Sequence, residues 1–344
     1  MMNTLLSLPD LILVILGFIF LIFGGESVVQ GAITIARKMN VSPLLIGFTI
    51  VAVGTSLPEL AVTINAVSSD SQDLVDLAVG GVLGSNVANV MLVLGTAAML
   101  GACEKPGVGI KKDAIAVIMA SLILLFTVIM GEISQLTGFL MVIALVSYYY
   151  YSYNDSKKLG LDEELEETWM GENMLLSSIV TVLGGVMIVL GAELLIEGST
   201  GIADSFGISE SIVGLSVIAL GTSLPELAVT VIAAIRGHEG VAIGNVLGSN
   251  VINILGILGI SSAYAGGIVV SDIFAARDIL NNKNSTPDQR TEAERTIKIN
   301  QNVLQKELGV PAEYAAIISS QELFESNMTR FVNEYNDAQL KKRN

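Results

Sequence analysis

Long apolar runs alternate with short polar stretches along the first 279 residues of the chain. A membrane-spanning helix needs about 20 mainly apolar residues, and residues 11–23, 114–130 and 174–196 approach or reach that length. The first run lacks a basic segment before it and contains Asp10, so we interpret it as a retained helix rather than a signal peptide. The pattern predicts spans near residues 10–25, 42–67, 77–100, 113–130, 135–153, 174–196, 208–235 and 241–263.

The apolar pattern occurs twice in the chain. The decapeptide GTSLPELAVT occupies residues 54–63 and returns at 221–230, an offset of 167 residues. A second motif, VLGSNV, occupies residues 82–87 and returns at 246–251, an offset of 164, because the intervening loop is three residues shorter in the second copy. Repeated motifs at a fixed spacing indicate an internal duplication.

The number of predicted spans in the first copy determines how the second copy enters the membrane. Five spans per copy force the second copy into the opposite orientation. Lysine and arginine concentrate in cytoplasmic loops, and loops 68–76, 131–134 and 197–207 contain neither residue. We therefore predict an all-α, multi-pass cell-membrane protein with inverted-topology repeats, broken helices at the midplane and its N-terminus outside; only Arg277 departs from the charge rule.

Polar segments divide the chain into four predicted parts. The segment between the copies is acidic, which is typical of a solvated cytoplasmic linker. After Ile279 no window is apolar enough to span a bilayer, and Thr286 followed by Pro287 is a favourable start for a soluble helix. We predict a first transmembrane repeat at residues 1–153, a linker at 154–173 and a truncated second repeat at 174–279. Residues 280–344 are predicted to form a small helical appendage that is a candidate protein-binding module.

Composition narrows the class of function. Hydrophobic residues make up 52% of the chain and charged residues only 15%, a balance that soluble domains rarely reach. The net charge of −15 disfavours nucleic acid as a partner and suits a protein that handles cations. Cys103 is the only cysteine, so the chain has no internal disulfide, and no Cys/His cluster predicts zinc. We expect neither a resident cofactor nor enzymatic chemistry.

Each decapeptide places a proline and a glutamate inside an apolar segment. Proline deprives the carbonyl one turn earlier of its donor, and hydrocarbon tolerates such a group only where a cavity or an ion satisfies it. A lone proline kink is usually structural. A carboxylate inside the bilayer is expensive and is a functional hypothesis by default, and here two occur at equivalent positions. Glu59 and Glu226 are therefore the central candidates for a cation site.

The neighbouring candidates are all hard oxygen donors. In GSNVxN the serine and the asparagine are four residues apart, and so lie on one face of a helix. Carboxylate, hydroxyl, amide and main-chain oxygens together favour Ca²⁺, Na⁺ or Mg²⁺ over transition metals. The predicted side-chain ligands are Thr55, Ser56, Ser85, Asn89, Thr222, Ser223, Ser249 and Asn253, with freed carbonyls around Ala52, Thr55, Ala219 and Thr222.

Two further sets of equivalent residues have weaker interpretations. Glu26 and Glu193 correspond between the copies. They either line an access path or lie at the membrane interface, where a charged side chain costs little free energy. Glycines one turn apart in the second motif predict close approach of neighbouring helices. These glycines are Gly80 and Gly84 in the first copy, and Gly244 and Gly248 in the second.

The doubled GTSLPELAVT and GSNVxN motifs resemble the two alpha repeats of the calcium/cation antiporter superfamily, specifically prokaryotic sodium/calcium exchangers. The resemblance covers roughly residues 5–279. It implies five plus five helices, a central cation site built from the second, third, seventh and eighth, and a first and sixth helix that slide across it. It also implies ion ligation by the candidates named above, with main-chain oxygens at Ala52 and Ala219.

The sequence departs from that family in two places besides the appendage. The first copy has Gly80-Gly81 where the second has the family's Gly-Asn pair, Gly244-Asn245. Both deep positions are asparagine, Asn89 and Asn253, where potassium-dependent relatives carry aspartate, which favours independence from potassium.

The charge of the site suggests the transport reaction. One Ca²⁺ or two Na⁺ neutralise two carboxylates, and an empty dianionic site resists dehydration, so the sequence predicts obligatory exchange of Ca²⁺ for Na⁺ by alternating access. Two alternatives stay open. A carboxylate binds a proton as well as Na⁺, which would make the protein a Ca²⁺/H⁺ exchanger. Residues 280–344 stand where the family has its last two helices, which would also fit a transport-deficient membrane protein whose tail binds a partner.

Overall fold

The structure is a computed structural model that describes residues 9–69, 72–104, 107, 109–159, 171, 173–206, 221, 223–269, 286–287 and 290–291. The chain divides into two units. One contains residues 1–126 and 133–268, and with them both copies of each motif; the other contains residues 127–132 and 269–344.

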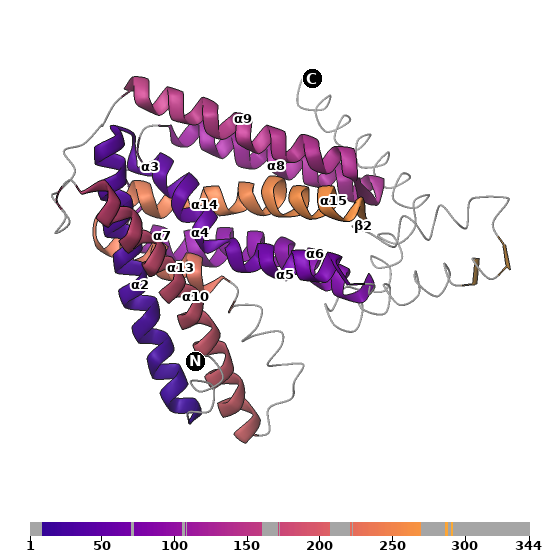
Figure 1. The fold of residues 1–344 in the computed structure, drawn as a ribbon, viewed down its shortest axis with the longest axis horizontal. Coiled ribbons are helices and arrows are strands. Elements are labelled where there is room, and N and C mark those ends of the chain that lie inside the picture. Colours follow the sequence, from indigo (N-terminus) through magenta and orange to yellow (C-terminus); the bar gives the residue numbers. More distant parts are fainter. Residues whose placement is uncertain are drawn as a thin grey trace, which may run out of the picture. The chain divides into compact units, whose positions relative to one another are not determined.

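The described residues are mostly helical, as predicted (Figure 1). Two short strands, β1 and β2, pair with each other. The segments η1, η2 and η4 are π-helical turns, a wider helix that is common at functional sites. The elements are α2 Asp10–Met39, α3 Pro43–Ile46, η1 Gly47–Val51, α4 Ala52–Thr55, α5 Leu57–Val67, α6 Gln72–Ala88, η2 Asn89–Leu94, α7 Gly95–Met99, α8 Ile110–Met130, β1 Glu132–Ser134, α9 Gln135–Leu159, α10 Met174–Ser205, α13 Leu224–Ile235, α14 Glu239–Val251, η4 Ile252–Leu258, α15 Gly259–Ala265 and β2 Gly267–Val269.

Several helices in the described part of the chain can cross a membrane, which makes this a multi-pass membrane protein. Five are long and apolar enough on their own, and a bent pair makes a sixth. Helix α8 coincides with the predicted span 113–130, and α13 lies in the predicted span 208–235, of which the structure describes 221 and 223–235. The qualifying segments are Asp10–Met39, Ala78–Met99, Gln135–Lys158, Met174–Ser205, Glu239–Ala265 and the pair Pro43–Thr55 with Leu57–Val67.

Three helices continue beyond their predicted spans. Helix α2 extends 14 residues past residue 25, and ends at Asn40, whose φ of 54° is the left-handed conformation of a helix cap. Helix α10 continues to Ser205, and α9 to Leu159. Hydropathy reports the part of a helix that matches the bilayer, whereas a helix ends where the backbone finds a cap or a breaker.

Helices α2 and α10 pack against each other along glycines spaced seven residues apart (Figure 1). A Cβ atom added to Gly17 would lie 2.8 Å from the Gly191 carbonyl oxygen, and one added to Gly24 would lie 2.8 Å from the Gly184 carbonyl oxygen. Rising numbers on one helix meet falling numbers on the other, so the two helices are antiparallel. Only glycine permits backbones to approach this closely.

The same contacts reveal the symmetry of the duplication. At the offset of 167 residues, Gly184 is the equivalent of Gly17 and Gly191 is the equivalent of Gly24. The contact between Gly17 and Gly191 is therefore the image of the contact between Gly184 and Gly24. A surface that meets its own equivalent in this reciprocal way has a two-fold axis. Equivalent, antiparallel membrane helices are what inverted-topology repeats require.

The continuous helix formed by α14, η4 and α15 is the most buried of the described membrane helices. Its Gly244 and Gly248 face α3 and η1: a Cβ on Gly244 would lie 2.8 Å from the Phe48 backbone nitrogen, and one on Gly248 would lie 2.7 Å from the Phe48 Cα atom. The predicted small-residue packing is thus confirmed for the second copy. No described residue comes within 4 Å of a Cβ placed on Gly80 or Gly84 in the first copy.

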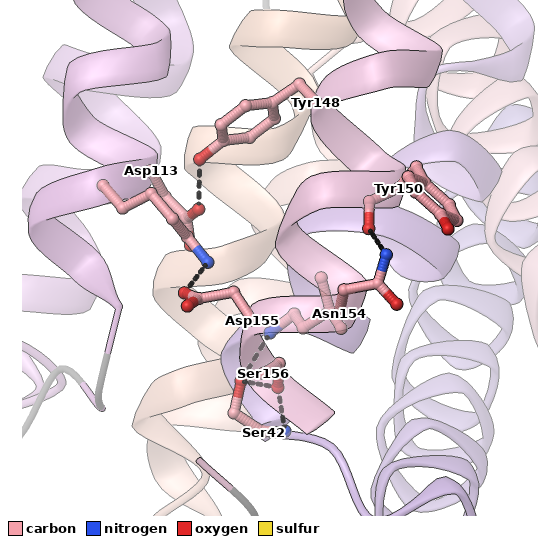
Figure 2. Close-up of polar contacts among 9 residues, drawn as sticks. Ser42, Asp113, Tyr148, Tyr150, Asn154, Asp155 and Ser156 are labelled. Carbon is pink, nitrogen blue, oxygen red and sulfur yellow. Dashed lines mark hydrogen bonds and ion pairs between the residues drawn. The ribbon is translucent and has the colours of Figure 1, made fainter. Parts of the chain in front are cut away.

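A polar cluster joins α8 and α9 to the start of α3 (Figure 2). The Tyr148 hydroxyl donates to Asp113 Oδ1 at 2.6 Å, and Lys112 Nζ pairs with Asp155 Oδ2 at 2.9 Å. The Ser42 backbone N–H donates to Ser156 Oγ at 2.8 Å. Ser42 is the N-cap of α3 and accepts from the Leu45 backbone N–H at 3.3 Å. The cluster therefore fixes the beginning of the segment that leads into the first decapeptide.

Candidate cation site

The first decapeptide breaks a helix, as predicted. Helix segments Pro43–Thr55 and Leu57–Val67 meet at an angle of 45°. Ser56, at the break, has φ −90° and ψ 5°, and Ser223 in the second copy has nearly the same values, −93° and 2°. Because Pro58 has no N–H, it cannot donate to the Gly54 carbonyl four residues earlier.

One expectation about the break is wrong. The Ala52 carbonyl was expected to be freed, but it accepts from the Ser56 backbone N–H at 3.1 Å, and Thr55 Oγ1 lies 3.3 Å from it. The physical reason is that Ser56 still completes the last turn of α4, so the donor lost to Pro58 belongs to a later carbonyl. Ala52 is fully buried beside the break, and its role as an ion ligand stays a prediction.

The two candidate carboxylates are brought together inside the protein. The exposed fractions of Glu59 and Glu226 are 6% and 0%. The two are close enough to repel each other electrostatically. Ser56 Oγ, from the first copy, donates to Glu226 Oε1 at 3.3 Å. Two desolvated negative charges side by side are unfavourable unless a proton or a cation compensates for them.

The second motif surrounds the carboxylates with hydroxyl and amide groups. Thr55 Oγ1 lies 3.4 Å from Ser249 Oγ, and Asn253 Nδ2 donates to Ser85 Oγ at 3.3 Å, so both contacts join the two copies. The Ser85 side chain is in turn close to Glu59. Asn89 is the first residue of the π-helical turn η2 and is fully buried. Asn253 lies within the π-helical turn η4.

Many oxygens of this cluster have no hydrogen-bond partner among the described residues. Buried polar atoms in proteins are almost always hydrogen-bonded, so a group of exceptions needs an explanation. A bound cation supplies one, because carboxylate, amide and hydroxyl oxygens are the ligands of Ca²⁺ and Na⁺. The unpartnered oxygens of the predicted ligands are Glu59 Oε1 and Oε2, Glu226 Oε2, Asn89 Oδ1, Asn253 Oδ1 and Ser223 Oγ.

The donor set is also chemically selective. The residues that the structure describes contain no group of three or more histidine, cysteine, aspartate or glutamate side chains. A cation held here would therefore be bound by two carboxylates and neutral oxygens, which suits a hard ion. Two predicted ligands, Ala219 and Thr222, lie outside the described residues, and their roles stay predictions.

Asn245 is a site residue that sequence reasoning missed. It is fully buried, and its Nδ2 donates to the Glu226 carbonyl at 3.2 Å and to Thr230 Oγ1 at 3.0 Å. Its Oδ1 accepts from Thr55 Oγ1 at 3.2 Å. A signal was present: Asn245 precedes Ser249 by four residues, which places both on one face of α14.

The second pair of equivalent glutamates does not share one environment. Glu26 Oε2 forms an ion pair with Arg236 Nε at 2.9 Å, and Glu26 Oε1 accepts from Gln30 Nε2 at 3.1 Å. Glu193 is exposed on α10. Their predicted role in an access path stays a prediction. A pocket lined by Val28, Thr55 and Ile188 lies between α2, η1, α4 and α10, and neither glutamate lines it.

These features define a class of protein. Equivalent helices that run antiparallel, an interrupted helix and buried carboxylates where the two copies meet are the recurring construction of secondary transporters. The sequence pattern of the family described as sodium/calcium exchanger protein matches residues 10–154 and 176–282. The chain belongs to the sodium/calcium exchanger family, a family of cation antiporters in which the ions are cargo rather than cofactors.

Individual relatives agree with this assignment. The chain is 31% identical over 299 residues to the sodium/calcium exchanger MaX1 of Methanosarcina acetivorans, covering 74% of this chain and 83% of that one. Its fold is similar to the solved sodium/calcium exchanger from Methanococcus jannaschii, with a TM-score of 0.62, 31% identity, and coverage of 74% and 81%. A structure of the exchanger NCX_Mj soaked with Na⁺ and Ca²⁺ gives a TM-score of 0.64, 27% identity, and coverage of 78% and 86%.

Proposed function

We propose that this chain exchanges Ca²⁺ for Na⁺ across the cell membrane by alternating access, with its N-terminus outside. The observation that carries the proposal is the buried pair Glu59 and Glu226, three of whose four carboxylate oxygens have no hydrogen-bond partner among the described residues. Similarity to proteins named sodium/calcium exchangers supports the choice of ions.

Charge balance explains why two different loads compete for one site. The uncompensated dianion is costly to bury, whereas one Ca²⁺ or two Na⁺ make the site neutral. A site that is favourable to bury only when loaded couples the movement of one ion to the return of the other. In this proposal the ligands are the two glutamates with Thr55, Ser56, Ser85, Asn89, Ser249 and Asn253, and their equivalents Thr222 and Ser223.

Calcium-45 efflux from proteoliposomes tests the proposal. The purified chain is reconstituted with Ca²⁺ inside, and a Na⁺ gradient is applied with the pH held equal on both sides. We expect Na⁺-dependent efflux, its loss in Glu59→Gln and Glu226→Gln, and its retention in Glu132→Gln, which changes an exposed glutamate in β1. Efflux that needs only a pH gradient would instead establish Ca²⁺/H⁺ exchange.

The same assay addresses the appendage. A chain that ends at residue 279 keeps both copies of each motif. Equal Na⁺-driven efflux with and without residues 280–344 is expected if transport resides in the repeats. Absence of flux from the full chain under every gradient would refute the exchanger and favour a membrane protein that acts by binding.

A further inference from the structure

The hydrogen bonds at the site do not obey the symmetry of the duplication. Ser56 donates to Glu226, the glutamate of the other copy, at 3.3 Å. The image of this bond would run from Ser223 to Glu59. Neither Ser223 Oγ nor either Glu59 carboxylate oxygen has a partner among the described residues. Glu226 is thus held by the opposite copy, and Glu59 is not.

The second motif repeats this asymmetry. Asn253 Nδ2 donates to Ser85 Oγ at 3.3 Å. The image of this bond would join Asn89 to Ser249. Neither Asn89 Oδ1 nor Asn89 Nδ2 has a partner within the described part of the chain. In both motifs, therefore, the second-copy residue, Glu226 or Asn253, bonds the opposite copy, and its first-copy equivalent, Glu59 or Asn89, has no side-chain partner among the described residues.

One sequence difference coincides with the imbalance. Asn245 ties the Glu226 carbonyl, Thr230 and Thr55 into one network, with three contacts of 3.0 to 3.2 Å. Its equivalent at the offset of 164 is Gly81, which has no side chain.

The threonine that follows each glutamate by four residues responds to this difference. In the first copy the Thr63 hydroxyl turns back and donates to the carbonyl of Glu59, on its own helix, at 2.7 Å. In the second copy Asn245 supplies the donor to the Glu226 carbonyl, and Thr230 accepts from Asn245 as well. The start of α13 is therefore anchored to α14 and, through Thr55, to the first copy. Among the described residues, the Glu59 carbonyl at the start of α5 accepts this side-chain hydrogen bond from Thr63 on its own helix, and no side-chain hydrogen bond anchors it to the other copy.

We infer that Asn245 is a positioning residue that fixes Glu226 as a rigid ligand, whereas Gly81 leaves Glu59 free to adjust to the cation. The inference rests on the cation site of the proposed function. A ligand held in place by its surroundings lowers the cost of ordering on binding. A ligand without such restraints can adapt its geometry to a different ion, which is useful where ions of different charge and number share one site.

Shortening each carboxylate by one methylene tests the inference. Equilibrium binding of calcium-45 to the purified full chain in detergent, without Na⁺, gives both the dissociation constant and the number of sites. A fixed backbone cannot move to restore the lost contact, so Glu226→Asp should raise the dissociation constant about tenfold more than Glu59→Asp does, the size expected when a buried polar partner is lost. In the Asn245→Ala background the two substitutions should have similar effects.

Placing an asparagine at the equivalent position of the first copy provides an independent test. No described residue comes within 4 Å of a Cβ at Gly81, so Gly81→Asn has room there. In that variant Glu59→Asp should become as damaging as Glu226→Asp. A change confined to the number of sites reports a folding defect, so the dissociation constants are compared on the binding-competent fraction.

Each outcome decides one question. Equal effects of Glu59→Asp and Glu226→Asp in the unsubstituted chain, or effects of Asn245→Ala and Glu226→Asp that simply add, would overturn the role of Asn245 and leave the exchanger intact. If a Glu226 variant does not fold, Gly81→Asn without any effect on Glu59→Asp would overturn it too. No Ca²⁺ binding by the unsubstituted chain would remove the proposed function and, with it, this inference.

Discussion

Gly184 and Gly185 are neighbours on α10 with opposite surroundings, and replacing each by alanine tests the packing of α10 on α2. A Cβ at Gly184 would lie 2.8 Å from the Gly24 carbonyl oxygen and 2.8 Å from Ser27 Cβ. Contacts under 3.0 Å are essentially never seen for real Cβ atoms, so the two helices would have to separate by several tenths of an ångström. No described residue comes within 4 Å of a Cβ at Gly185.

The expected change in stability follows from two opposing contributions. Overpacking a close contact costs about 1–3 kcal/mol. Replacing glycine by alanine inside a helix gains roughly 0.5–1 kcal/mol. The gain is common to both variants, so the difference between Gly184→Ala and Gly185→Ala isolates the contact. We expect Gly184→Ala to be about 1–3 kcal/mol less stable than Gly185→Ala, and Gly185→Ala to be at least as stable as the unsubstituted chain.

The assay is loss of the monodisperse peak in size-exclusion chromatography after heating the detergent-solubilised protein. Gly184→Ala should lose the peak at a lower temperature than either Gly185→Ala or the unsubstituted chain. Gly17→Ala should behave like Gly184→Ala, because its Cβ would meet the Gly191 carbonyl oxygen at the same 2.8 Å. Equal midpoints for Gly184→Ala and Gly185→Ala would refute the close antiparallel contact on which the two-fold relation rests.

Two further predictions concern the polar contacts of the described helices. Tyr148→Phe removes the donor to buried Asp113 and should lower stability by about 1–3 kcal/mol in the same heating assay, whereas Tyr150→Phe, at a side chain that is 71% exposed, should leave it unchanged. Arg236→Gln removes the ion pair with Glu26; because the arginine is 56% exposed, the loss should stay below about 1 kcal/mol and should disappear as salt is raised. A loss for Arg236→Gln that persists in high salt would show that the pair is more than a screened surface contact.

The approach of the two carboxylates could be predicted from the sequence, and the reason is local. A proline beside a glutamate in an apolar segment is costly wherever it stands, so its duplication already implied a shared compensating partner. The spacing of four residues between Ser85 and Asn89 placed them on one helix face without any tertiary information. Local rules sufficed within each helix, and the duplication supplied the one long-range inference, that the two glutamates share a partner.

What escaped prediction depends on contacts between distant segments. Glu26 and Arg236 are 210 residues apart, and nothing in either segment indicates the other. The length of α2 escaped because Glu26, Ser27 and Gln30 interrupt its apolar run, whereas the helix continues to its cap at Asn40. The Ala52 carbonyl was assigned to the break from the position of Pro58, but the backbone of Ser56 keeps the turn intact for one residue more.

The two decapeptides carry the same letters and nevertheless have different hydrogen bonds, so the cause of the difference must lie outside them. It lies on the neighbouring helix, at Asn245 and Gly81. Had both carboxylates been held as Glu226 is, fewer oxygens would be left for a cation. Had both been free, the site would have to order two ligands at once on every binding event. Holding one and leaving the other keeps three carboxylate oxygens available and limits the ordering cost to one side chain. An imperfect duplication is therefore better suited to the proposed exchange than a perfect one, and the departure that matters is a single residue one turn before Ser249.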